Sequence, residues 1–161
     1  MARCVRCASS SVEGETVASL IRTAKAALAR EHERLQNRSF LEATMAASAL
    51  VAMADGEVKF SELSALDDLL ESVGELQIYD PHVAVDICRR YVEGIADDVE
   101  TGKAKALGAV GKFAGDDEAA RLVVQMCLVI SHSDGEFSES EADAVRDLCA
   151  ALWLDPGDVG L

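Results

Sequence analysis

Proline and aromatic residues are scarce in this sequence, which has two prolines and 4% aromatic side chains among 161 residues. Runs of β-branched residues are also few, whereas alanine and leucine are abundant. This composition favours closely packed helices. We therefore predict an all-α fold, a single compact bundle of about seven helices. The expected helices are 15–36, 39–54, 59–73, one that begins at Pro81 after an N-cap at Asp80, 100–114, 119–132 and 138–152.

Positive charge is in short supply, with 15 Lys and Arg against 29 Asp and Glu and a formal net charge of −14. Nucleic-acid-binding proteins present a basic face to phosphates, so the composition argues against nucleic acid as a partner. Residues 1–38 hold seven basic and four acidic residues (net +3), and residues 39–161 hold eight and twenty-five (net −17). An acidic body suits a cation, a basic partner or both. The alternative is that acidity simply keeps an alanine-rich domain soluble.

Long apolar runs are also lacking, and no stretch reaches the roughly 20 residues that a membrane-spanning helix needs. The N-terminus has no apolar core of a secretory signal. We expect a cytoplasmic protein whose five cysteines are reduced. Residues 1–14 have no helical period, and we expect them to be a disordered extension of a helical domain over 15–161.

The cysteines do not predict a zinc site. Cys4 and Cys7 form one CxxC pair, whereas a zinc site usually takes about four ligands, and the sequence has no second pair. Cys88, Cys127 and Cys149 each fall within an apolar helical pattern, which is typical of small core residues.

Catalytic motifs are absent as well. The sequence has no glycine-rich phosphate loop after a strand, no Gly-x-Ser-x-Gly and no His-Glu-x-x-His. The three histidines are scattered, and none pairs with a nucleophile. His132 has two interpretations, an auxiliary metal ligand or a surface residue at a helix end. We therefore predict a non-enzymatic protein.

The most distinctive stretch of the sequence occurs twice. Residues 54–62 read Ala-Asp-Gly-Glu-Val-Lys-Phe-Ser-Glu, and residues 133–141, 79 positions later, read Ser-Asp-Gly-Glu-Phe-Ser-Glu-Ser-Glu. Each follows an apolar helical pattern and opens an amphipathic one. This arrangement predicts an internal pseudo-twofold repeat of two hairpins, each a helix, an acidic turn and a second helix.

Each acidic stretch matches part of a calcium-binding EF-hand loop. Asp, Gly, the apolar residue and the last Glu would fall at loop positions 5, 6, 8 and 12. Positions 1 and 3, which should supply oxygen ligands, are then Val51 and Met53 in one copy and Ile130 and His132 in the other. These residues exclude a standard EF-hand for both copies.

A purely structural interpretation explains much of each stretch. Gly56 and Gly135 stand where a helix C-terminus favours a left-handed residue. Ser138 and Glu141 fit a capping box, Ser-x-x-Glu, that would open the helix 138–152. The first copy departs from this pattern because it has Lys59 in place of the capping serine, yet it keeps Glu62.

A functional interpretation stays open beside it. Carboxylates that leave one helix and enter the next can chelate a hard cation such as Ca²⁺, Mg²⁺ or Mn²⁺. If the two halves pack about a twofold axis, the two turns could share one site. The candidate ligands are Asp55, Glu57 and Glu62 in the first turn and Asp134, Glu136 and Glu141 in the second.

Glycines weaken the expected helix 100–114, each by up to about 1 kcal/mol relative to alanine. They are Gly102, Gly108 and Gly111. They either allow a close contact with another helix or make the segment mobile.

Together with three further stretches, 36–40, 75–80 and 154–161, the paired Asp-Gly-x-x-x-x-x-Glu turns resemble the TerB tellurite-resistance family. The similarity covers about residues 15–161. It implies an all-helical, internally pseudo-symmetric fold and a role in resistance to tellurite and related stress. The family's suspected metal ligands fall on Asp55, Glu62, Asp134 and Glu141.

The same resemblance implies partners and a location. Members are thought to act in the cytosol and at the inner face of the membrane. Their partners there are other Ter proteins, including TerC, an integral membrane protein. We accordingly expect peripheral membrane association. A metal-free alternative is an acidic adaptor that docks such a partner.

Overall fold

The computed structural model describes residues 22, 38–54, 56, 80–132 and 137–161. All regular structure within these residues is helical, which confirms the predicted all-α class. The predicted helices 15–36 and 59–73 lie outside the described residues, and so does the extension 1–14. The α-helices are α3 (Arg38–Ala52), α5 (Pro81–Asp97), α6 (Val99–Val110), α7 (Asp117–Ser131) and α8 (Glu139–Leu152), with 3-10 turns η2 (Gly111–Phe113) and η3 (Pro156–Val159).

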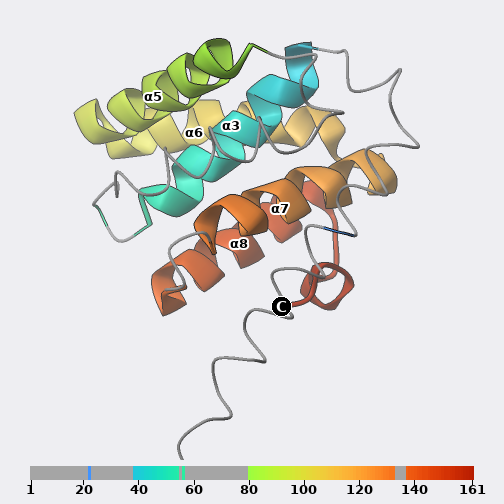
Figure 1. Cartoon of the computed structure of the whole chain (residues 1–161). Helices are drawn as coiled ribbons and strands as arrows, with labels where there is room; N and C mark the ends of the chain where they lie inside the picture. Colours follow the sequence, from blue (N-terminus) through green and yellow to red (C-terminus); the bar gives the residue numbers. More distant parts are fainter. Residues whose placement is uncertain (1–21, 23–37, 55, 57–79, 133–136) are drawn as a thin grey trace, which may run out of the picture.

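Helix α3 is the centre of the bundle. It lies between the α5–α6 pair and the α7–α8 pair and contacts all four of these helices (Figure 1). Its side chains from Phe40 to Val51 are all buried except Glu42. A helix that is apolar on every side has no face to offer to water, so other helices must surround it.

Helices α7 and α8 pack against each other and form the predicted second hairpin. Helix α7 is buried along most of its length, whereas α8 buries one face, through Val145, Leu148, Cys149 and Leu152. Burial of each large apolar side chain contributes about 1.5 to 3 kcal/mol. The internal repeat remains a prediction, because the second helix of the first hairpin is outside the described residues.

Helices α5 and α6 meet at a tight corner. The side chain of Asp80 accepts the backbone N–H of His82 at 2.9 Å, which confirms the predicted cap at the start of α5. Asp98 separates the two helices and caps α6, since its carboxylate accepts from the backbone N–H of Thr101 at 3.0 Å and from its hydroxyl at 2.9 Å. Helix α6 ends at Val110, and η2 continues it in the tighter 3-10 form to Phe113.

One of the glycines in α6 makes the corner possible. A Cβ added to Gly102 would lie 2.5 Å from the carbonyl oxygen of Gly94 and 2.5 Å from Cα of Ile95. Both atoms belong to the backbone of α5, so they cannot move aside as a flexible side chain would. The close-contact interpretation is therefore confirmed at Gly102, whereas a Cβ at Gly108 would meet open space.

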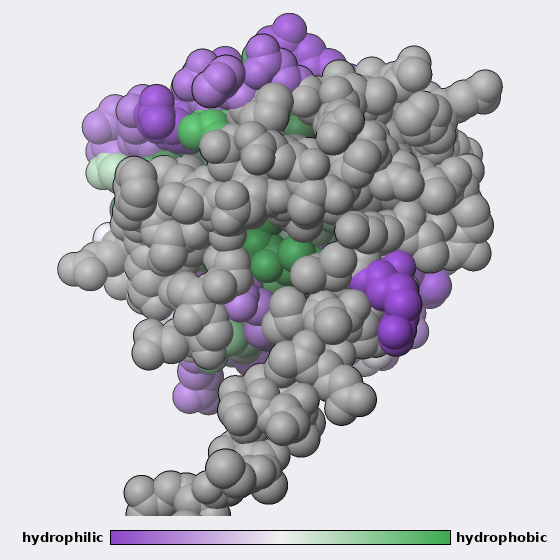
Figure 2. All heavy atoms as spheres, in the orientation of Figure 1, coloured by the Kyte–Doolittle hydropathy of each residue, from purple (hydrophilic) through white to green (hydrophobic). Residues whose placement is uncertain are grey.

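The surface is mainly hydrophilic over α5, at the top of the space-filling view (Figure 2). Short polar links also join the helices: Arg121 of α7 pairs with Asp158 of η3 at 3.2 Å, and Lys112 of η2 pairs with Glu42 of α3 at 3.8 Å. Among the described residues, no helix is both long enough and apolar enough to cross a membrane.

Candidate functional site

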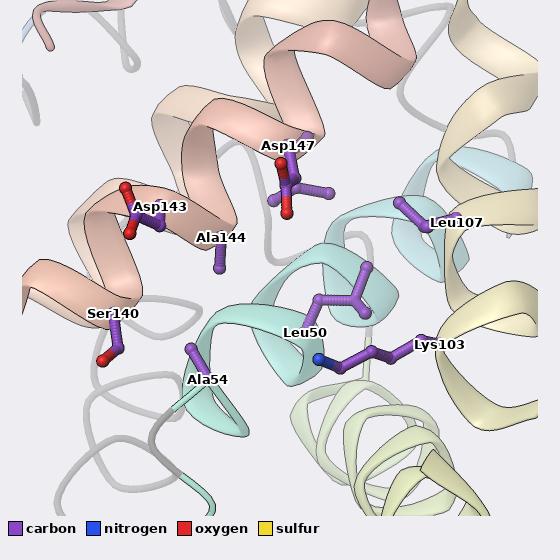
Figure 3. Close-up of a pocket in the computed structure, with 9 residues that line it drawn as sticks. Leu50, Ala54, Lys103, Leu107, Ser140, Asp143, Ala144 and Asp147 are labelled. Atoms are coloured by element: carbon purple, nitrogen blue, oxygen red, sulfur yellow. The ribbon is translucent and has the colours of Figure 1, made fainter. Parts of the chain in front are cut away.

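A pocket of about 310 Å³ opens where α3, α6 and α8 meet (Figure 3). Its apolar lining is buried or half-buried, whereas its polar lining is exposed at the rim. Asp143 and Asp147 extend from α8 and Lys103 from α6, with Leu50 of α3 between Asp147 and Lys103 in this view (Figure 3). The lining residues are Leu50, Ala54, Lys103, Leu107, Ser140, Asp143, Ala144, Asp147 and Leu148.

The pocket joins the ends of both acidic stretches. Ala54, at its wall, is bonded directly to Asp55 of the first stretch. Ser140, also at its wall, belongs to the second stretch and to the first turn of α8. The fold therefore brings one described residue from each of two stretches that are far apart in sequence to the wall of one pocket.

Five of the six predicted ligands lie outside the described residues. They are Asp55, Glu57, Glu62, Asp134 and Glu136. The described residues contain no group of three or more His, Cys, Asp or Glu side chains arranged to hold a metal ion. A cation site at this pocket therefore depends on the predicted carboxylates of the two stretches.

Glu141, the sixth predicted ligand, lies within the described residues, and only 3% of its surface is exposed. Its Oε2 accepts the backbone N–H of Ser138 at 2.6 Å, and Ser138 Oγ accepts the backbone N–H of Glu141 at 3.2 Å. These two bonds form the predicted capping box. Glu141 thus has a structural role, and its role as a ligand remains a prediction.

The end of α3 confirms the role expected of Gly56. This residue has φ +87°, a left-handed conformation that side chains other than glycine adopt at a cost. Its N–H donates to the carbonyl of Met53 at 3.2 Å, and the N–H of Ala54 donates to the carbonyl of Val51 at 2.9 Å. These bonds satisfy carbonyls that the helix end leaves free. Gly135 lies outside the described residues.

An aromatic stack joins the end of α7 to Phe137 of the second stretch. The rings of His132 and Phe137 lie 4.3 Å apart between centroids, at 18° to each other. Both are half-buried, and His132 is the residue at the C-terminal end of α7, the position that the helix-end interpretation gives it. His132 Nδ1 is 2.8 Å from the carbonyl oxygen of Leu128, which can only accept, so Nδ1 donates. This leaves Nε2 as the ring nitrogen suited to ligation.

Three of the cysteines lie buried in the core. Burial raises the pKa of Cys127 to about 12, and the nearby Cys88 and Glu141 add to the rise. Cys88 and Cys149 are also buried, and none of the three forms a disulfide. They are small core residues, as the sequence predicted.

The sequence did not identify the charged residues of the pocket rim. Asp143 and Asp147 are four residues apart and therefore share one face of α8 with Ala144 and Leu148. Asp143 also pairs with Arg146. The helical spacing of the two aspartates beside an apolar stripe was a usable signal. No sequence pattern indicates Lys103, which comes from another helix.

Comparison with known proteins gives two matches. Residues 41–161 match the model of the family described as "Tellurite resistance protein TerB". The chain is also 26% identical, over 99 residues, to the "Tellurium resistance protein TerB" of Alcaligenes sp; the match spans 62% of this chain and 81% of that protein. No solved structure matches the chain at a significant level.

Proposed function

The chain belongs to the TerB tellurite-resistance family, and from this premise we propose that it acts in tellurite resistance as a non-enzymatic module that binds a divalent cation. The cation would be Ca²⁺, Mg²⁺ or Mn²⁺, because carboxylate oxygens are the ligands that these ions prefer. The two acidic stretches supply the carboxylates: Asp55, Glu57 and Glu62 from the first, and Asp134, Glu136 and Glu141 from the second.

The observation that supports this proposal is the position of Ala54 and Ser140 on the wall of one pocket. Each residue belongs to a different acidic stretch, and we propose on this basis that carboxylates of both stretches bind a common ion. Ca²⁺ takes six to eight oxygen ligands, and the carboxylates of both stretches together would supply most of them. We therefore propose one shared site per chain.

The structural role of Glu141 is compatible with ligation. The capping box uses Oε2 of its carboxylate. A carboxylate has a second oxygen with lone pairs available, so Oε1 can bind a cation while the cap persists. In this proposal Glu141 fixes the start of α8 and contributes one ligand.

Calorimetric titration with Ca²⁺, Mg²⁺ and Mn²⁺ tests the proposal. The wild type should give binding heat, and the Asp55→Ala/Asp134→Ala double variant should not. An Asp86→Ala/Glu93→Ala variant makes the same change of net charge on exposed positions of α5 and should bind as the wild type does. Absence of heat at millimolar cation, or equal heat in the wild type and the Asp55→Ala/Asp134→Ala variant, contradicts cation binding.

A second candidate function is a metal-free acidic adaptor that docks a membrane-bound Ter-system partner, such as a TerC-like protein. The exposed carboxylates of Asp143 and Asp147 at the pocket rim favour it, in a chain with a net charge of −14. Docking of this kind would weaken with salt and persist in EDTA. Pulldown from a membrane extract with and without EDTA separates the two functions, because only the cation-dependent one is lost to the chelator.

A further inference from the structure

Trp153, the one tryptophan in the sequence, stands at the C-terminal end of α8 with 77% of its surface exposed. The other exposed large apolar residues among those described have smaller exposed fractions: Val99 57%, Val83 42% and Leu161 37%. Tryptophan is on average a highly buried residue, and it is enriched at the centres of protein interfaces. The fold of the described residues gives the indole of Trp153 little to pack against.

The backbone of Trp153 is also unusual. It has φ +62° and ψ +31°, and it is the only residue other than glycine with a positive φ among the described residues. Its N–H donates to the carbonyl of Ala150 at 3.2 Å, and the N–H of Leu154 donates to that of Cys149 at 2.9 Å. Glycine is the usual residue at such a helix end, because a bulky side chain is strained in this conformation. Strain of this kind is found most often at functional sites.

One edge of the indole lies near the loop before α7. A Cβ added to Gly115 would lie 3.4 Å from Cζ3 of Trp153 and 3.8 Å from its Cε3, so the edge of the ring rests beside this glycine. Gly115 itself has φ +88°. One edge of the ring thus lies beside Gly115, and most of the ring is exposed.

The charges around the ring are acidic. The exposed Asp117 and Glu118 follow Gly115 in the chain, and the exposed Asp155 follows Trp153. Of the described basic residues, Lys112 pairs with Glu42 at 3.8 Å and Arg121 pairs with Asp158 at 3.2 Å. The carboxylates of Asp117, Glu118 and Asp155 would repel an anionic lipid surface.

We propose that Trp153 anchors a docking surface for a basic segment of another protein. A lysine or arginine of that segment stacks on the indole, whose face attracts cations, and its neighbours pair with Asp117 and Asp155. This inference rests on the docking function proposed above and names its anchor. It is independent of cation binding by the acidic stretches.

The test uses a fluorescently labelled, amidated peptide of alternating arginine and leucine, with glutamate in place of arginine as the control peptide. Binding is followed by anisotropy in EDTA at fixed ionic strength. The Trp153→Gly variant should bind the arginine peptide about fivefold or more weakly than the wild type, the loss expected for one cation–π contact. Val99→Ala removes exposed apolar surface at the start of α6 and should bind as the wild type does. The glutamate peptide should bind neither protein.

Trp153→Gly is a suitable variant because glycine suits the left-handed backbone, so its melting temperature by circular dichroism should be no lower than that of the wild type. If the wild type does not bind the arginine peptide, the docking function itself is wrong. If the wild type and Trp153→Gly bind it equally, docking occurs without Trp153 and the anchor is wrong. Two further results would also overturn the proposal, if peptide binding does not require Trp153. One is co-sedimentation with anionic vesicles that requires Trp153, and the other is self-association in the ultracentrifuge that requires Trp153.

Discussion

Ser138 and Glu141 cap each other at the start of α8: Glu141 Oε2 accepts the backbone N–H of Ser138 at 2.6 Å, and Ser138 Oγ accepts that of Glu141 at 3.2 Å. Glu141→Ala removes the buried acceptor and should lower the free energy of unfolding by about 1 to 2 kcal/mol. Glutamine also completes a capping box, so Glu141→Gln should lose less. Urea denaturation of the three proteins measures the difference. An unchanged stability of Glu141→Ala would mean that the reciprocal cap does not stabilise α8.

The same pair of variants separates the structural role of Glu141 from its proposed role as a ligand. Glu141→Gln keeps the cap but removes the negative charge. If Glu141 binds the cation, this variant should bind it more weakly while remaining folded. Calorimetry with Mn²⁺, beside circular dichroism, measures both properties. An unchanged affinity would confine Glu141 to capping.

Gly102 and Gly108 differ in their surroundings although both lie in α6. At Gly102 an added Cβ would collide with the backbone of α5, and Gly102→Ala should destabilise the protein by about 1 to 3 kcal/mol. Gly108 is exposed with open space around it, so Gly108→Ala should stabilise by about 0.5 to 1 kcal/mol through higher helix propensity. Urea denaturation of the two variants checks this contrast. A similar effect of both would be inconsistent with the close α5–α6 contact.

Asp98 should make stability depend on pH. Hydrogen bonds from the backbone N–H of Thr101, and then from its hydroxyl, hold the pKa of Asp98 below its ordinary value of 3.8. A lowered pKa in the folded state stabilises the protein fully above 3.8, and this contribution is lost as the pH falls through the folded pKa. Asp98→Asn cannot titrate. The wild type should therefore be the more stable near neutral pH, with the difference fading in acid; a pH-independent difference would argue against this account.

The core cysteines should react slowly in the native protein. Burial raises the pKa of Cys127 to about 12, and burial followed by the nearby Asp155 raises the pKa of Cys149. Only the thiolate is a good nucleophile, so these thiols are both inaccessible and protonated at neutral pH. Iodoacetamide labelling, followed by peptide mass spectrometry, should modify Cys127 only when the protein is unfolded in urea. Rapid labelling in native buffer would show that the core opens readily.

Local rules predicted most of the helix boundaries from the sequence. Asp80 with Pro81, and Ser138 with Glu141, each begin a helix through neighbours in the chain, and the structure contains both. The central position of α3 followed from its apolar residues on every side. These features depend on residues a few positions apart, so a sequence pattern can show them.

Features that depend on the packing of distant segments were not predictable in the same way. The glycine pattern did not show which of Gly102 and Gly108 faces α5. Lys103 reaches the pocket from α6, and no local pattern links it to Asp143 and Asp147 on α8. Helix propensity gives no reason to expect Trp153, a bulky residue, in a left-handed conformation. Each of these facts is set by which helices meet.

The central claim is that the two acidic stretches share one cation at the pocket that Ala54 and Ser140 line. The most direct test is the stoichiometry of Mn²⁺ binding by calorimetry in the wild type and in the single variants Asp55→Asn and Asp134→Asn. A shared site predicts one ion per chain, and each single variant should weaken that one binding event. Two ions per chain, with each variant removing one and leaving the other intact, would contradict the shared site, as would an absence of binding by the wild type.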